Sequence, residues 1–236
     1  KDQDPSCYWV SEKLDGVRAV WDGQTFWSRG NNEFLAPVWF RALMPQGIVL
    51  DGELFAGRKN FRDSPSVQTR APSDRQWRKL RYMVFDAPLI AGDFEARMKK
   101  LRSVITDGPH IELVAQRACA GKADLDAFHR EIKAQGAEGV MLRLRGSSYE
   151  RKRSSTLLKV KDFIDDEARI VGYNAGKDRG SYKAVLVSSG ASFNVTVRDP
   201  SWSGLPVGTI ITVRYFELTP AGKPRFPVMV AVRDYE

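Results

Sequence analysis

Cysteine and histidine are scarce in this chain of 236 residues, which contains two of each. These are too few ligands for a cysteine-rich zinc site. The spacing of Cys7 and Cys119 does not decide between a disulfide and two free thiols, and we expect two buried thiols by default. No apolar run approaches the ~18 residues of a membrane span, so we expect no membrane partner.

The chain does contain enough apolar residues for a packed core, and it carries surplus positive charge. Its residues are 42% hydrophobic and its net charge is +8. The length fits one large domain or two small ones. A basic chain suits a polyanionic partner, although many soluble proteins are equally basic. The first residue is Lys1 rather than methionine, which indicates removal of a segment by processing or during preparation, and no signal peptide is visible.

The stretch that organises the rest runs from Glu12 to Arg18 and reads Glu-Lys-Leu-Asp-Gly-Val-Arg. The apolar residues 7–10 lead into it, and we expect them in a buried strand. Lys13 can act as a nucleophile only without its proton, a state that burial and the nearby cation of Arg18 both favour. Gly16 would let the backbone come close to a ligand. From these residues alone, an exposed turn after a strand is an equally good interpretation.

Two carboxylates, Asp51 and Glu53, interrupt the apolar run of residues 48–55. Buried carboxylates are unfavourable unless they are paired, hydrogen-bonded or bound to a metal. Two lysines, Lys159 and Lys161, alternate in a strand predicted over residues 157–161, which puts both on one side. Two like charges there favour an anion between them, and a phosphate fits.

The remaining predicted elements of the first half follow from periodicity and turn residues. Residues 17–29 predict a hairpin with its turn at Asp22-Gly23, and helical spacing predicts helices over 93–105 and 124–134. Residues 80–86 predict a strand that contains Phe85.

Residues 58–81 are strongly basic, and Phe61 and Trp77 are interleaved with the cations. A charge run is usually a solvated face, but a contact with a phosphate backbone is a fair second interpretation. The candidate DNA-binding residues in this run are Arg58, Lys59, Arg70 and Arg75.

After a linker predicted over residues 162–167, the pattern changes to five short strands separated by turns. Five strands in about seventy residues predict a small Greek-key barrel of the oligonucleotide-binding type. Lys177 and Arg179 lie in a Gly-Lys-x-x-Gly stretch near its start, and Arg225-Phe226-Pro227 and Arg233 lie near its end.

Taken in the order in which they occur along the chain, the motifs described above resemble those of the covalent nucleotidyltransferases. This superfamily comprises DNA ligases, RNA ligases and mRNA capping enzymes. The resemblance implies that Lys13 attacks the α-phosphate of a nucleotide and carries AMP, and that Glu53 and Glu138 hold a divalent cation. For Arg29 the alternative to nucleotide binding is a solvated position at the end of the hairpin. For Phe85 the alternative is a plain role in the core. The residues implied to bind the nucleotide are Glu12, Arg18, Arg29, Glu53, Phe85, Lys159 and Lys161.

The barrel motifs and the small size resemble minimal two-domain bacterial ATP-dependent DNA ligases, often called ligase E. This resemblance implies an α+β adenylation domain over residues 1–163 and an OB-fold domain over residues 164–236. It also implies ATP and Mg²⁺ as cofactors, nicked double-stranded DNA as partner, and a monomer. Export to the periplasm is suspected, with the cytoplasm as the alternative.

The chain departs from the family pattern at its end, where Asp234-Tyr235-Glu236 stands in place of Asp-Lys after Arg233. The change leaves open which residue orients pyrophosphate during self-adenylation, a role for which Arg225 and Arg233 are the candidates. The alternatives for function are an RNA ligase, a GTP-dependent capping-type enzyme, and a non-catalytic nucleic-acid-binding module.

Overall fold

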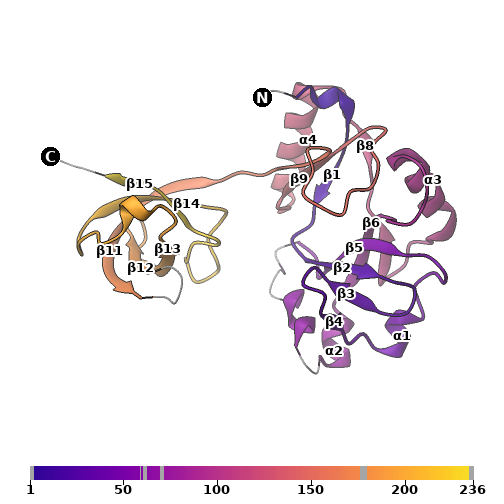
Figure 1. Ribbon diagram of the computed structural model, residues 1–236, viewed down its shortest axis with the longest axis horizontal. Helices are drawn as coiled ribbons and strands as arrows, with labels where there is room; N and C mark the ends of the chain where they lie inside the picture. Colours follow the sequence, from indigo (N-terminus) through magenta and orange to yellow (C-terminus); the bar gives the residue numbers. More distant parts are fainter. Residues whose placement is uncertain (1–2, 59, 61–62, 70–71, 176–179, 234–236) are drawn as a thin grey trace. The chain divides into compact units, whose positions relative to one another are not determined.

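The chain folds into two compact units that divide between Val160 and Lys161 (Figure 1). The structure is a computed structural model, and it describes residues 3–58, 60, 63–69, 72–175 and 180–233. The sequence prediction set the domain boundary at 163/164. The fold class was predicted correctly, because an α+β domain built on two sheets precedes a closed β-barrel.

A six-stranded sheet forms the larger half of the first unit. The predicted hairpin is confirmed: β2 and β3 are antiparallel, with Gly23 of the turn at a φ of 104° that favours glycine. β5 pairs with β2 on one side and β6 on the other. The strands in sheet order are β4 (Glu33–Phe34), β3 (Phe26–Ser28), β2 (Val17–Trp21), β5 (Leu50–Phe55), β6 (Arg81–Asp86) and β7 (Ile111–Leu113).

The other sheet of this unit contains the N-terminal strand. Its order is β10 (Leu157–Val160), β9 (Gly139–Leu144), β1 (Tyr8–Lys13) and β8 (Arg117–Ala118). α4 (Lys122–Ala134) packs on one face through Leu125 and Ile132, which join Tyr8, Val10 and Val140 in one apolar cluster. Since side chains alternate along a strand, Lys13 lies on the face opposite to that cluster.

Among the described residues of this unit, the remaining helices are α3 (Phe94–Val104) and four short ones. Asp93 caps α3, and Phe94, Met98 and Leu101 face inward as its spacing predicted. Both predicted helices are thus confirmed. The short helices are η1 (Pro5–Cys7), α1 (Val38–Arg41), η3 (Pro65–Gln68) and α2 (Asp74–Trp77).

An aromatic cluster fills the core beneath the six-stranded sheet. Trp77 is fully buried, with its ring centroid 4.8 Å from that of Phe40 and 6.3 Å from that of Phe26. Trp77, which the sequence interleaves with the cations of residues 58–81, is therefore a core residue rather than part of a solvated basic surface. Gly52 is required in this core, because a Cβ there would lie 2.7 Å from the ring of Tyr82.

The second unit is a closed five-stranded barrel, as predicted. Its strands are β11 (Ile164–Asn174), β12 (Ser181–Leu186), β13 (Ser192–Thr196), β14 (Ile210–Tyr215) and β15 (Val228–Arg233), with η4 (Pro200–Trp202) between β13 and β14. The order β11-β12-β13-β15-β14 closes on itself, with β13 and β15 parallel. This is the Greek-key arrangement of an OB-fold.

The linker predicted over residues 162–167 is wrong from Ile164 onward, because β11 starts there and pairs with β14. Its charged residues are accommodated on the solvent side, where both Asp165 carboxylate oxygens accept hydrogen bonds from Arg214 at 2.6 Å. Charge alone had suggested a linker, whereas cross-strand pairing decides the structure.

The two cysteines are free thiols, and Cys119 is buried as expected. Cys7 is exposed, contrary to the expectation of two buried thiols. Among the helices that the structure describes, none is long and apolar enough to cross a membrane.

Candidate active site

Lys13, the last residue of β1, is paired in register with Gly139 at the start of β9. Glu138 directly precedes β9, and the Lys13 ammonium donates a hydrogen bond to Glu138 Oε2 in an ion pair. The Lys13 side chain is 21% exposed and that of Glu138 is 7% exposed. The structure thus joins two residues that are far apart in the sequence, the predicted nucleophile and a predicted metal ligand.

Gly16 brings the turn after Lys13 against β5. A Cβ at this position would lie 2.5 Å from the carbonyl oxygen of Leu54 and 2.7 Å from Cγ of Glu53. Only glycine therefore permits this approach, which accounts for the glycine that follows Asp15 in the motif.

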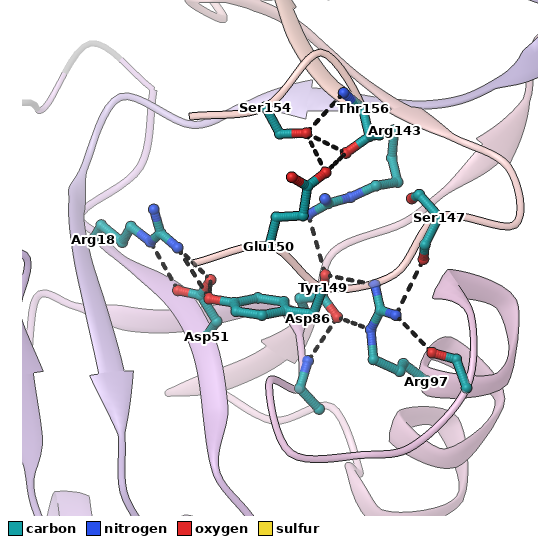
Figure 2. Close-up of polar contacts among 12 residues, drawn as sticks. Arg18, Asp51, Asp86, Arg97, Arg143, Ser147, Tyr149, Glu150, Ser154 and Thr156 are labelled. Carbon is teal, nitrogen blue, oxygen red and sulfur yellow. Dashed lines mark hydrogen bonds and ion pairs between the residues drawn. The ribbon is translucent and has the colours of Figure 1, made fainter. Parts of the chain in front are cut away.

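Arg18 and Asp51 form a two-pronged ion pair on the six-stranded sheet, beside the site (Figure 2). Arg18 Nε and Nη2 donate to the two Asp51 carboxylate oxygens at 2.9 and 2.6 Å. The Tyr149 hydroxyl donates to the same carboxylate at 2.8 Å and accepts from Arg18 at 3.2 Å. Burial and the nearby negative charge of Asp51 raise the pKa of Tyr149 to about 12. Sequence reasoning did not find Tyr149.

This pairing changes the expected charge around Lys13. The sequence suggested that the cation of Arg18 favours the unprotonated amine. In the structure Asp51 compensates Arg18, and Glu138 compensates Lys13. Carboxylates therefore dominate the charge next to the amine.

Glu53 lies opposite Arg18 on β2 and Met83 on β6, so its side chain shares a sheet face with both. Burial raises the pKa of Glu53 to about 8; the positive charge of Lys13 opposes this shift, and the negative charge of Glu138 adds to it. The three predicted catalytic and metal-binding residues are thus brought together.

The carboxylates of Glu53 and Glu138 fit a magnesium ion. Proteins commonly hold Mg²⁺ through one or two carboxylates, and substrate phosphates and water complete its oxygen ligands. Among the residues that the structure describes, no cluster of three or more histidine, cysteine or acidic side chains could hold a metal by itself.

Phe85 is half-buried on β6 and alternates with Met83, so it shares the face that carries Glu53. Its ring centroid lies 6.0 Å from the guanidinium carbon of Arg18. A flat apolar surface beside these charged groups can stack on a base.

A buried charge cluster lies beside the site and joins the two sheets (Figure 2). Asp86 of β6 accepts hydrogen bonds from Arg97 of α3 at 2.6 and 3.2 Å and from Arg143 of β9 at 3.1 Å. All three residues are buried, and burial lowers the pKa of Arg143. Arg97 also donates to the Ser147 carbonyl at 3.2 Å, which anchors the segment that follows β9. Sequence reasoning missed this cluster.

The segment between β9 and β10 is ordered by its own polar side chains. Glu150 accepts hydrogen bonds from Ser154 and from Thr156, the latter at 3.0 Å (Figure 2). Three exposed cations stand between these residues, and sequence reasoning did not single them out: Arg151, Lys152 and Arg153.

The two lysines after β9 do not share one strand. Lys159 is exposed on β10, opposite Met141 of β9, which in turn lies opposite Ser11 of β1. It therefore faces the same side of the sheet as Lys13. β10 ends at Val160, so the predicted alternation of Lys159 with Lys161 within a strand is wrong. The Lys161 ammonium instead lies 4.5 Å from the ring centroid of Phe216 in the barrel unit.

Glu12 and Arg58 contact each other behind the site. Arg58 Nε and Nη2 donate to the two carboxylate oxygens of Glu12 at 2.9 and 2.6 Å. Because Glu12 precedes Lys13, its side chain leaves β1 on the opposite face. Arg58 was predicted to bind DNA, and Glu12 was predicted to bind the nucleotide.

The other cations of the basic run are mostly paired. Arg75 is exposed and makes no ion pair with any residue that the structure describes. Lys59, Phe61 and Arg70 lie outside the described residues. Ion pairs join Arg78 to Asp74, Lys79 to Asp63 and Arg81 to Glu112.

The remaining predicted residues lie at exposed turns or in the barrel. Arg29 is exposed in the turn after β3. Arg225 forms an ion pair with Glu217, and its guanidinium carbon lies 5.3 Å from the ring centroid of Phe226. Arg233 ends β15 and approaches Glu167 at 3.9 Å. Lys177 and Arg179 lie outside the described residues.

The fold and the site define a class of protein: a nucleotidyltransferase domain, with a lysine held between carboxylates, followed by an oligonucleotide-binding barrel. The family model for an ATP dependent DNA ligase domain matches residues 2–161, and the model for a DNA ligase OB-like domain matches residues 176–233. The chain belongs to the ATP-dependent DNA ligase family.

Individual relatives agree. A DNA ligase of Haemophilus influenzae is 33% identical over 232 residues, which cover 92% of this chain and 84% of the relative. A solved Lig E DNA ligase superposes with a TM-score of 0.88 at 33% identity, covering 98% of this chain and 94% of that one. The Chlorella virus DNA ligase-adenylate gives a TM-score of 0.56 at 25% identity, covering 98% and 93%. These findings favour a DNA ligase over the RNA ligase and capping-type alternatives.

Proposed function

We propose that this DNA ligase acts as a monomer and seals nicks in duplex DNA through AMP bound covalently to Lys13. The observation that carries the proposal is the Lys13 amine, held by Glu138 next to Glu53. Lys13 is also the one lysine of the sequence that stands in a Lys-x-Asp-Gly-x-Arg context.

In the first step, the Lys13 amine attacks the α-phosphate of ATP, a nitrogen–phosphorus bond forms, and pyrophosphate leaves. The ammonium must lose a proton first, and its hydrogen bond to Glu138 gives that proton an acceptor. Phe85 stacks on the purine, while Arg18 and Lys159 bind phosphate. Arg225 and Arg233 orient the pyrophosphate.

Glu53 and Glu138 are the residues that would hold a magnesium ion. When bound there, the ion would neutralise charge at the reacting phosphate. Glu138 contacts the Lys13 amine, and the charges of both residues act on Glu53, which supports this assignment.

In the later steps, AMP passes from Lys13 to the 5′-phosphate of the nick. The 3′-hydroxyl then attacks that phosphate and expels AMP. Each step develops charge on phosphate oxygens, which cations stabilise. Arg29 contacts the DNA end, and Arg75 with the barrel cations Lys177 and Arg179 grips the phosphate backbone.

Two assays test the proposal. Incubation with α-labelled ATP followed by a denaturing gel reports covalent AMP, and a nicked duplex with DNA or RNA strands at the nick reports sealing. Labelling with ATP together with sealing of the DNA nick supports the proposal. A protein that binds DNA but takes no label would be a non-catalytic module instead. Location in the periplasm stays a prediction, which fractionation of cells that express the full-length protein tests.

A further inference from the structure

Arg58 connects two segments of the chain: one ends at Lys13, and the other leads to Glu138. It follows β5 in a turn that Gly57 starts, with a φ of 95°. Besides its two hydrogen bonds to Glu12, its Nη1 donates to Gln135 Oε1 at 2.8 Å. One guanidinium therefore binds both β1 and the end of α4, whose C-cap is Gln135.

The two residues that Arg58 holds are close in sequence to the two members of the ion pair. Glu12 is bonded to Lys13, and the short segment 136–137 joins Gln135 to Glu138. Arg58 thus binds the side chains of two residues that stand close in sequence to the members of the Lys13–Glu138 contact. Its contact with Glu12 lies on the face of β1 opposite to that of Lys13.

The charge of Arg58 is already compensated in this arrangement. Both prongs of its fork are bound to the Glu12 carboxylate, and its side chain is 35% exposed. A phosphate contact would have to replace these charge-assisted hydrogen bonds. Arg75, exposed and without an ion pair among the described residues, offers phosphate a cation without that exchange.

We propose that Arg58 is a positioning residue for AMP attachment to Lys13 rather than a contact to the DNA backbone. The inference rests on the proposed function, because it assigns Arg58 a role in that reaction. Near-attack geometry is demanding, and a displacement of about 1 Å can slow a reaction by roughly 100-fold.

The test measures the single-turnover rate of AMP attachment in Arg58→Ala, Arg58→Lys and Glu12→Gln at saturating ATP. We expect Arg58→Ala and Glu12→Gln to slow attachment by about 10- to 100-fold with little change in KM for ATP. The double variant Arg58→Ala with Glu12→Gln should be no slower than the slower of the two single variants, because both changes break the same ion pair. Arg58→Lys should recover only part of the rate, since an ammonium cannot form the fork.

Arg214→Ala is the matched control, because Arg214 makes the same two-pronged contact, with Asp165, in the barrel. It should attach AMP at the wild-type rate.

A second readout is the salt dependence of binding to a nicked duplex that lacks the 3′-hydroxyl. Its slope should be the same for Arg58→Ala and wild type, whereas removal of a phosphate contact would reduce it by about one.

Attachment at the wild-type rate in Arg58→Ala, with a reduced salt slope, would overturn the inference and leave the proposed function intact. If Arg58→Ala does not fold, Glu12→Gln and Arg58→Lys carry the same comparison. A wild-type protein that takes no AMP would overturn the proposed function and this inference with it.

Discussion

The ammonium of Lys13 and the carboxylate of Glu138 form an ion pair between the end of β1 and the residue before β9. The pair thus connects the proposed nucleophile to a residue far away in the sequence. Under the proposed function, Lys13 has to leave this contact to attack a phosphate, which would link the strength of the pair to the rate of AMP attachment.

Glu138→Ala should remove most AMP attachment. Removal of one carboxylate at a catalytic magnesium costs several kcal/mol of transition-state stabilisation, which corresponds to about 100-fold or more in rate. Part of the rate should return at high magnesium, which a titration of attachment against the metal measures. A near-wild-type rate at low magnesium would show that the carboxylate is not needed for the metal.

Glu53 should make folding stability depend on pH. Its pKa is about 8 in the folded protein and near its ordinary value of 4.5 when unfolded, so the folded state binds the extra proton. Stability should therefore fall as the pH rises from about 5 to about 8, by an amount on the order of a few kcal/mol. Glu53→Gln should flatten this profile in urea unfolding. Parallel profiles of stability against pH for Glu53→Gln and wild type would contradict the raised pKa of Glu53.

Asp86→Ala should destabilise the first unit strongly, because it leaves Arg97 and Arg143 buried without their carboxylate. Breaking a buried pair in this way costs about 3–5 kcal/mol. The control is Asp165→Ala, which should have little effect on stability because Asp165 and its partner Arg214 are both exposed to solvent. Urea unfolding measures the stability of both variants, and an equal loss of stability in the two would contradict this prediction.

Reversal of Arg70 and Arg75 to glutamate should weaken binding to a nicked duplex and flatten its salt dependence. Removal of each phosphate contact reduces the slope by about one. AMP attachment should survive, because it needs no DNA. Unchanged affinity and slope, measured by titration at several salt concentrations, would show that this part of the basic run is only a solvated surface.

The sequence predicted what depends on local patterns. The hairpin turn at Asp22-Gly23, the helix that Asp93 caps and the barrel strands all follow from neighbouring residues. The order of the motifs also identified residues that meet at the site, because Lys13 and Glu138 are indeed in contact.

The rest depends on partners distant in sequence. Helical spacing grouped the apolar residues of α3 without Arg97, yet Arg97 is buried, and the carboxylate of Asp86, from a strand, compensates its charge. Trp77 is interleaved with cations in the sequence, which does not reveal that Phe40 and other aromatic residues bury it. Arg58 was assigned to DNA because the sequence does not reveal that Glu12 lies beside it.

The most direct test of the account is the site of AMP attachment. After incubation with α-labelled ATP and magnesium, protein digestion and mass spectrometry should place AMP on Lys13. Lys13→Ala should take no label and should not seal an ordinary nick, but it should retain some sealing of a nick whose 5′-phosphate already carries AMP. Undiminished labelling of Lys13→Ala, or AMP on another lysine, would contradict the account.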